Sequence, residues 1–357
     1  MEILNLSLVN FRNFSVKKIA FEKNLPAGRQ GLTVVIGPNG SGKSNILEAI
    51  ALFSGMRPVR IETDFDLVKF GKNEVKVEAK VFSWNQEKVL TINMVVLDGN
   101  HIQKAYFVDS IKKRLADLVL NLSIVIFSPQ DLELVTGSPS LRRHHLDDRL
   151  SSVDRQYHRS ILAYNKIVVR RNKILQRIAE GKSRPTELDF WDERILEHAK
   201  FISQKRKDFF EFLNFVSGGA EQILLKGLSW DFKQSLLTTE KLFQNRERDI
   251  AAGITLSGPH RDDFRFLFNK EDLAVFGSRG EQRLAVLELK LAELEYYQTK
   301  LQSRPILALD DIFSELDWEH RRAILSIIGK QQTIITATET DSVPKQIFKK
   351  AKIVELQ

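Results

Sequence analysis

The chain has 357 residues, of which 43% are apolar and none is cysteine. This length allows one large domain or two of moderate size, and the missing cysteine excludes disulfides, thiol nucleophiles and cysteine-based zinc sites. No signal-peptide pattern and no stretch of roughly 20 apolar residues is found, so we expect a cytoplasmic protein without a membrane partner. The net charge of +8 and the isoelectric point of about 9.4 permit polyanion binding without establishing it.

The first part of the chain predicts strands that lead through a glycine-rich turn into a helix. Alternating apolar residues predict strands at 4–11 and 16–21, and the Pro- and Gly-containing segment 25–31 predicts a loop. The apolar run 32–36 predicts a buried strand, and apolar residues at helical spacing predict a helix at 45–53.

The next part of the chain predicts an antiparallel sheet that is distinct from a parallel core. Apolar and charged residues alternate at 75–81, as in a half-solvated strand, and further strands are expected at 89–97 and 101–108. Asp98 and Gly99 between the last two strands are typical of a hairpin turn. The apolar run 122–127 predicts a buried strand.

Residues 141–226 predict a helical hairpin that is broken at 181–186 by glycine and proline. Its first arm carries ten basic residues against three acidic ones, an excess of seven. A solvated helix face and a track for a phosphate backbone both explain this charge. Four of the arginines are candidate DNA contacts: Arg142, Arg143, Arg170 and Arg171.

The last part of the chain returns to alternating strands and helices. Strands are expected at 254–268, 306–309 and 333–336, and helices at 281–299 and 318–328. Strands that alternate with helices favour an α/β fold.

One stretch, Gly37-Pro-Asn-Gly-Ser-Gly-Lys-Ser44, has the pattern G-x-x-x-x-G-K-S between an expected strand and an expected helix. Its glycines let backbone N–H groups point at phosphate oxygens, and the helix N-terminus adds its dipole. Lys43 can reach the β/γ-phosphates, and Ser44 can hold Mg²⁺. The alternative is an ordinary glycine-rich turn, which the strand and helix on either side disfavour.

A pair of acids, Asp310 and Asp311, ends the apolar run 306–309. In a protein with a phosphate loop, a carboxylate at the end of a buried strand helps to hold Mg²⁺, so Asp310 is the candidate metal acid. Asp311 can act as a general base or orient the attacking water. The alternative is a pair of acids in a surface turn.

The segment Ser278-Arg-Gly-Glu-Gln282 opens the helix expected at 281–299. Serine and glycine at a helix N-terminus suit a phosphate, and a simple N-cap explains the serine about as well. Because the chain already has one phosphate loop, a second anion site makes most sense when it caps a nucleotide bound to another subunit.

Together these motifs resemble the ABC-type ATPases of the SMC class and, within that class, the RecF family of bacterial recombination-repair proteins. The resemblance covers nearly the whole chain. The segments that carry it are 8–13, 37–44, 127–135, 141–147, 257–264, 278–284 and 309–317.

The resemblance implies an α/β P-loop ATPase head, with a mixed sheet plus an antiparallel sheet, and a helical second lobe, divided as 1–140, 141–250 and 251–357. It implies ATP and Mg²⁺ as cofactors, dimerisation on ATP and slow hydrolysis. It further implies binding to single-stranded, gapped or junction DNA. Mediator proteins and a RecA-type recombinase are implied partners, in recombinational repair, replication restart and the SOS response.

The resemblance also assigns site residues, with Gln130 in the Q-loop and Asp317 in a dimer-contact loop. The implied catalytic residues are Asp311 and Gln130, and the implied Mg²⁺ contacts are Ser44, Asp310 and Gln130. The implied nucleotide contacts are Arg12, Asn13, Gly37, Pro38, Asn39, Gly40, Ser41, Gly42, Lys43, Ser44, Asn45, Ser278, Gly280 and Gln282.

The chain departs from the wider pattern at a few positions. Asp311 replaces the more common glutamate of ABC ATPases, Gln130 replaces a more common glutamate, and 336–338 lacks the usual switch histidine. The loop at 26–31 is longer than the turn of the family.

Two other functions stay open at this point: an SMC-like ATPase that acts on protein or as an anti-phage effector, and a nucleotide kinase. The motif at 278–282 disfavours the kinase. His144, His145 and His260 are expected to be structural or DNA-facing rather than metal ligands, and Trp191 and Trp230 to be core residues.

Overall fold

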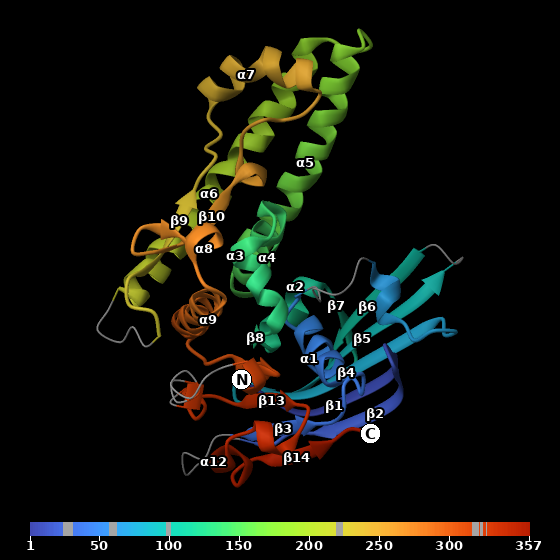
Figure 1. Cartoon of the computed structure of the whole chain (residues 1–357). Coiled ribbons are helices and arrows are strands. Elements are labelled where there is room, and N and C mark those ends of the chain that lie inside the picture. Colours follow the sequence, from blue (N-terminus) through green and yellow to red (C-terminus); the bar gives the residue numbers. More distant parts are fainter. Residues whose placement is uncertain are drawn as a thin grey trace. The chain divides into compact units, whose positions relative to one another are not determined.

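The computed structural model describes residues 1–23, 31–56, 63–97, 101–218, 224–315, 321, 324–325 and 327–357, with the backbone alone for 314 and 315. The chain divides into two compact units (Figure 1). The first unit combines residues 1–132 and 286–357, and the second unit comprises residues 133–285. The expected boundaries were 140/141 and 250/251, whereas in the structure residues 133–140 and 251–285 belong to the same unit as the helical part of the chain.

A six-stranded antiparallel sheet forms one layer of the first unit. Its strand order is β2-β1-β4-β5-β6-β7, and the expected alternation of buried and exposed residues is present in β4. Leu97 and His101 pair across the hairpin of β5 and β6, while the turn predicted at Asp98 and Gly99 lies outside the described residues. The strands are β1 (Glu2–Phe11), β2 (Phe14–Ala20), β4 (Glu74–Ser83), β5 (Gln86–Leu97), β6 (His101–Val108) and β7 (Ile111–Lys113).

A five-stranded parallel sheet forms the second layer of the first unit, in the order β14-β3-β13-β12-β8. Four of its strands were predicted, and the mixed α/β class with two distinct sheets is confirmed. Sequence reasoning missed β14, whose four residues are neither strongly apolar nor clearly alternating. The strands are β3 (Leu32–Ile36), β8 (Ile124–Phe127), β12 (Ile306–Asp310), β13 (Thr333–Ala337) and β14 (Lys352–Glu355).

Helix α1 (Lys43–Leu52) shares one apolar core with both sheets of the first unit. Ile46 and Ile50 of this helix are fully buried, together with Val77 of the antiparallel sheet and Ala308 and Ile334 of the parallel sheet. Because this helix is apolar on several sides, it is held from both layers, which fixes the loop that precedes it. Figure 1 shows α1 beside the strands of these sheets.

Short helical segments connect the strands of the first unit. They are η1 (Asp64–Leu67), α2 (Leu115–Leu118), η2 (Val119–Asn121), η3 (Pro129–Leu132), α10 (Ile312–Glu315), η6 (Thr340–Ser342) and α12 (Lys345–Phe348). The helix expected at 318–328 falls largely outside the described residues.

The second unit is built on the predicted helical hairpin, formed by α5 (Arg155–Ala179) and α6 (Asp189–Ser217). The predicted break between them lies at 180–188, with the short turn η4 (Pro185–Leu188). A preceding helix, α4 (Pro139–Val153), is followed by Asp154, whose carboxylate accepts hydrogen bonds from N–H groups in the first turn of α5. The N-cap explains why the helical stretch divides there.

A three-stranded sheet completes the second unit, in the order β11-β10-β9. The prediction of one strand over 254–268 was wrong, because only β10 (Asp263–Phe268) is extended. Gly258 has φ 124 and is followed by Pro259, so the chain turns into η5 (Pro259–Arg261) before the strand begins. The other elements are β9 (Leu228–Lys233), β11 (Glu271–Asp272), α3 (Glu133–Thr136), α7 (Thr239–Ala252), α8 (Leu273–Phe276) and α9 (Arg279–Leu301), which continues into the first unit.

None of the helices within the described ranges combines the length and the apolar character that a membrane crossing requires.

Candidate nucleotide-binding site

The predicted phosphate loop connects the C-terminal end of β3 to the N-terminus of α1. Gly40 and Gly42 have φ angles of 85 and 100, a region that glycine adopts readily. A Cβ atom on Gly42 would lie 2.5 Å from the ring of Phe14 and 2.8 Å from the side chain of Asn13. The glycine is therefore required here by both conformation and space.

Lys43 folds back over the loop that precedes it. Its Nζ atom donates hydrogen bonds to the carbonyl oxygens of Gly37, at 2.6 Å, and Pro38, at 3.0 Å. Burial lowers the pKa of Lys43, while the negative charges of Asp311 and Asp310 act in the opposite direction. The lysine is thus a buried cation beside two carboxylates, at the place where the sequence predicts phosphate.

Ser44 and Asp310 come together from positions 266 residues apart in the chain. The Ser44 hydroxyl donates to Oδ1 of Asp310 at 3.1 Å, and the Thr336 hydroxyl donates to the same oxygen at 2.6 Å. Parallel strands bring their carboxyl ends to one edge of the sheet, and β3, β13 and β12 are adjacent. The predicted metal acid and metal hydroxyl therefore lie side by side.

Asp311 leaves the strand in a conformation that only a few non-glycine residues adopt. Its φ is 51, and its backbone N–H donates to the Thr336 hydroxyl at 3.0 Å. Aspartate is among the residues that tolerate the left-handed region, and such conformations concentrate at functional sites.

The segment after β1 supports the loop. The Asn13 amide donates to the carbonyl oxygen of Ser41 at 3.1 Å and accepts from the Asn45 amide at 2.9 Å. The Arg12 guanidinium instead pairs with Glu48 of α1 at 2.8 Å. The predicted residues Asn13 and Asn45 thus contact the loop, while Arg12 is engaged by a carboxylate.

The residues at this edge fit a nucleotide phosphate with Mg²⁺. The Ser41 hydroxyl is buried and has no hydrogen-bond partner within the described residues, and no atom lies within 4 Å of the position of a Cβ on Gly40. Mg²⁺ prefers oxygen ligands and usually takes only one or two from protein carboxylates. The pair Ser44 and Asp310 matches this preference, and the described residues contain no group of three or more His, Asp or Glu side chains arranged to hold a metal ion.

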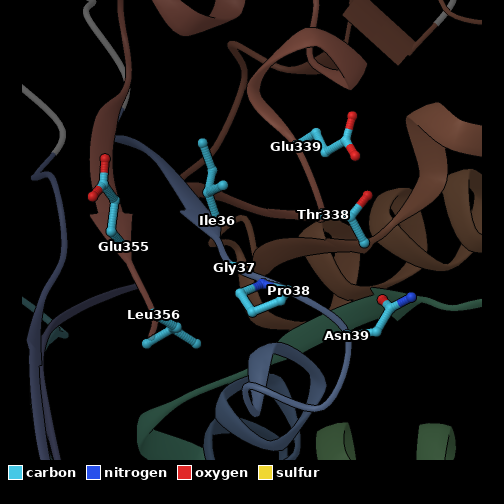
Figure 2. Close-up of a pocket in the computed structure, with 8 residues that line it drawn as sticks. All are labelled: Ile36, Gly37, Pro38, Asn39, Thr338, Glu339, Glu355 and Leu356. Carbon is cyan, nitrogen blue, oxygen red and sulfur yellow. The ribbon is translucent and has the colours of Figure 1, made fainter.

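A cavity of about 470 Å³ lies beside the phosphate loop (Figure 2). It is bounded by Gly37 and Pro38 on the loop, by Thr338 after β13, and by Glu355 and Leu356 at the end of β14. Because Lys43, Ser44 and Asp310 do not line it, this cavity adjoins the candidate phosphate site on one side and does not include its charged groups.

Gln130 lies in η3, directly after β8, and is half-buried. The neighbouring Asp131 fixes this turn, because its carboxylate accepts from the Ser128 N–H at 2.7 Å and pairs with Lys290 of α9 at 2.9 Å. Lys290 is 1% exposed. Sequence reasoning missed this ion pair, since a lysine inside an amphipathic helix gives no signal of its partner.

The predicted signature segment belongs to the second unit. Ser278 caps α9 in a reciprocal arrangement, in which its N–H and hydroxyl bond to Glu281 and its hydroxyl accepts from the Glu281 N–H at 3.3 Å. The N-cap alternative is therefore realised. A Cβ on Gly280 would meet only the Ser278 hydroxyl, at 4.0 Å, so the surrounding structure does not require glycine there.

Gln282 does not lie on the exposed side of the signature segment, which corrects its assignment as a nucleotide contact. It is 5% exposed, and its amide donates to the carbonyl oxygens of Leu273 and Gly277. The side chain therefore holds the turn before α9 within the second unit.

Two of the four candidate DNA contacts are buried, which corrects that part of the prediction. Arg142 forms a bidentate pair with Asp263 at 2.7 and 3.0 Å, and it is 8% exposed. Arg171 is fully buried and bonds to Asp192, at 2.8 Å, and Asp249, at 2.7 Å.

The other two candidate DNA contacts, Arg143 and Arg170, are not fully buried. Arg143 is half-buried and donates to the Asp262 carbonyl oxygen. Arg170 is exposed, with its guanidinium 5.6 Å from the ring centre of half-buried Trp191.

A second buried arginine of the helical hairpin also escaped sequence reasoning. Arg206 of α6 is 1% exposed and bonds to Asp147 at 2.7 Å, Asp262 at 2.8 Å and the Tyr157 hydroxyl at 3.0 Å. His260 nearby shares a hydrogen bond of 2.7 Å with the Tyr164 hydroxyl. Trp230 is buried, as predicted.

Two further predictions concern residues outside those that the structure describes. They are the dimer-contact residue Asp317 and most of the long loop at 26–31.

Comparison with known proteins shows which family this sequence belongs to. Residues 2–354 match the family model described as RecF/RecN/SMC N terminal domain. The DNA replication and repair protein RecF of Moorella thermoacetica is 34% identical, over 100% of this chain and 95% of that protein. The protein of the same name from Bacillus cytotoxicus is 33% identical, over 100% and 97%.

Solved structures of related proteins are also similar to this chain. A structure of the recombination mediator protein RecF with ATP, in the RecFOR pathway, matches with a TM-score of 0.85 and 30% identity, over 96% of this chain and 93% of that one. An Smc head domain of Pyrococcus furiosus, with a TM-score of 0.55 and 18% identity over 99% and 93%, shares the fold. The chain belongs to the RecF family of the SMC class of ATPases.

Proposed function

We propose that this chain is an ATP-dependent DNA-binding protein of recombinational repair, in which ATP with Mg²⁺ drives dimerisation and slow hydrolysis resets the dimer. The observation that carries the proposal is the meeting of the phosphate loop, Ser44 and Asp310 at one edge of the parallel sheet, with 3.1 Å between the serine hydroxyl and the carboxylate. The likeness to a RecF structure with ATP supports ATP as the nucleotide.

Each polar group at this edge has a proposed task. Lys43 would exchange its bonds to the Gly37 and Pro38 carbonyl oxygens for phosphate oxygens, while the buried Ser41 hydroxyl gains a partner. Ser44 and Asp310 would hold Mg²⁺, which neutralises phosphate charge when bound. Asp311 and Gln130 would orient the attacking water.

The other half of the site would come from a second copy of the chain. Ser278 is the exposed N-cap of a 23-residue helix and Gly280 lies in its exposed first turn, where an anion is favoured. Gly280 leaves room that its own unit does not use. In this proposal the first unit is the ATPase lobe, and the second unit carries both a helical lobe and the segment that caps the partner's nucleotide.

The biological role is proposed from the relatives and the charge. The curated relatives are named DNA replication and repair proteins, and the ATP-bound relative acts in the RecFOR pathway. We extend to this chain the binding of gapped or single-stranded DNA in the cytoplasm. The proposed partners are mediator proteins, and the proposed outcome is loading of a RecA-type recombinase in repair, replication restart and the SOS response. The net charge of +8 supports a polyanionic partner.

Sedimentation velocity with and without ATP, Mg²⁺ and a gapped DNA tests dimerisation and DNA binding together. We expect a monomer alone, a dimer with ATP and Mg²⁺, and co-sedimentation with gapped DNA that needs ATP and weakens as salt rises. A chain that stays monomeric with ATP would contradict the proposed switch. A dimer that ignores DNA would instead favour an SMC-like ATPase that acts on protein.

The variant Ser278→Arg sharpens this experiment. It should block the ATP-dependent dimer but leave ATP binding by the monomer unchanged, because the added side chain fills the space beside Gly280. The control is Ser140→Arg, which places the same side chain at an exposed serine in the first turn of α4, a different helix of the second unit. If Ser278→Arg still dimerises on ATP as the control does, the assignment of the signature segment is wrong.

A further inference from the structure

Thr336 lies near the end of β13, in the middle of the parallel sheet, at a place where the sequence lacks the usual switch histidine. The strand register sets Thr336 opposite Asp310 on β12 and opposite Val35 on β3, two residues before the phosphate loop. Thr336 is 1% exposed. The residue therefore lies between the phosphate loop and the acid pair without reaching the surface.

One hydroxyl group serves both acids. It donates to Oδ1 of Asp310 at 2.6 Å and accepts from the backbone N–H of Asp311 at 3.0 Å. The first bond turns the Asp310 carboxylate so that the same oxygen also receives the Ser44 hydroxyl, at 3.1 Å. The second bond satisfies an N–H at the point where the chain leaves the ladder between β12 and β13.

The second bond matters because Asp311, the first residue after β12, has a φ angle of 51. A non-glycine residue in that region persists only where its surroundings hold it. The Thr336 hydroxyl anchors the peptide that begins this turn, and so it helps to set the direction of the Asp311 side chain. Only a side chain that both donates and accepts can make the two bonds, which threonine and serine can do and valine cannot.

We infer that Thr336 is a positioning residue of the site, one that orients Asp310 toward Ser44 and fixes the Asp311 backbone without touching the nucleotide. The inference rests on the ATPase function proposed above. Residues that orient metal-holding groups typically contribute 10–100-fold to metal affinity or activity, although they contact neither metal nor substrate.

The test compares Thr336→Val, which keeps the volume and removes the hydroxyl, with Thr336→Ser, which keeps the hydroxyl. The matched control is Thr333→Val on the same strand. Thr333 is equally buried at 1%, but its hydroxyl donates to the Gln331 carbonyl oxygen, at the other end of β13. The change in stability caused by replacing a buried threonine with valine should therefore be similar in the two valine variants.

Two measurements do not depend on turnover. The first is the Mg²⁺ concentration that gives half of the Mg²⁺-dependent gain in affinity for a fluorescent ATP analogue. It should rise about 10–100-fold in Thr336→Val and less than about threefold in Thr336→Ser and Thr333→Val. The second is hydrogen exchange of the Asp311 amide without nucleotide, which should accelerate in Thr336→Val alone. Steady-state kcat for ATP hydrolysis should be lower in Thr336→Val, the variant in which the required Mg²⁺ concentration rises.

Each outcome decides the inference. Equal behaviour of Thr336→Val and Thr333→Val in both measurements would overturn it, and so would an equal loss in Thr336→Val and Thr336→Ser, which would assign the effect to packing. If Thr336→Val does not fold, Thr336→Ala takes its place in the same measurements. A wild-type chain that binds no nucleotide overturns the proposed function itself, whereas the exchange of the Asp311 amide still reports on the bond from Thr336.

Discussion

The candidate nucleotide site and the helical second unit both bury charged side chains, but they hold them differently. At the candidate site, the Lys43 cation bonds to backbone carbonyl oxygens and the Asp310 carboxylate bonds to hydroxyls. In the second unit, Arg171 and Arg206 lie among helices, and each is bound by two carboxylates. Loss of a buried arginine leaves its carboxylates without a cation and destabilises the fold, whereas loss of Lys43 removes hydrogen bonds to two carbonyl oxygens of the loop.

The largest effect that we predict breaks the second unit. Arg206→Met should lower the free energy of unfolding by about 3–5 kcal/mol, because it leaves the carboxylates of Asp147 and Asp262 without their cation. Denaturant unfolding followed by fluorescence measures it. The control Arg177→Met, at an exposed position of α5, should stay within about 0.5 kcal/mol of wild type. A loss at Arg206 as small as that of the control would refute the structural role.

The next effect concerns pH and again belongs to the second unit. Burial lowers the pKa of His260 from 6.5 to about 4, so the folded state holds this histidine neutral. The unfolded state takes up its proton first as the pH falls, and stability should therefore decrease between about pH 6.5 and pH 4. At about 1.4 kcal/mol per pKa unit the full loss is roughly 3 kcal/mol.

The free energy of unfolding of wild type and His260→Gln, measured across this pH range, isolates the contribution of the histidine. The difference between the two should shrink as the pH falls, because the variant lacks the titrating group. A constant difference from pH 7 to pH 4 would show that His260 does not titrate below its ordinary pKa in the fold.

In the first unit, loss of a buried cation should weaken nucleotide binding and leave the fold intact. Lys43→Ala should weaken ATP binding by about 100-fold, or about 2.8 kcal/mol, because the buried cation of the phosphate loop is lost. Isothermal titration calorimetry measures the affinity, and Lys18→Ala, at an exposed position of β2, is the control. Retained affinity in Lys43→Ala would remove the phosphate-loop assignment.

The smallest effect separates the two neighbouring arginines of α5. Arg170→Glu should weaken gapped-DNA binding a few-fold and reduce the slope of log affinity against log salt by about 1, as expected for one phosphate contact. Titrations at several salt concentrations measure this slope, and Lys18→Glu, on β2 of the first unit, serves as the control. An unchanged slope would favour the solvated helix face. Arg171→Glu should instead lower the stability of the second unit, since Arg171 is fully buried.

Much of the candidate site could be predicted because its residues are neighbours in the sequence. The phosphate loop needs eight consecutive residues between a strand and a helix, and apolar runs predicted four of the five parallel strands around it. Local signals also predicted the helical hairpin and its break. The prediction at 254–268 was wrong because Gly258 and Pro259 outweigh the apolar residues around them.

The remaining contacts join residues that are far apart in the chain. Thr336 with Asp310, Lys290 with Asp131 and Arg206 with Asp262 are brought together only when strands and helices pack. The same residue types are common on protein surfaces, so no local sequence pattern shows that these residues are buried and paired.

Sequence alone determined the family, the phosphate loop and the acid pair, because local order is enough to specify a strand, a turn and a helix N-terminus. Tertiary structure alone decided which of two adjacent arginines is exposed. Successive residues on a helix point about 100° apart, so Arg170 faces solvent while Arg171 turns inward to Asp192 and Asp249. It also decided that one threonine hydroxyl holds both acids, since only the order of strands in the sheet places β13 between the loop and the acid pair.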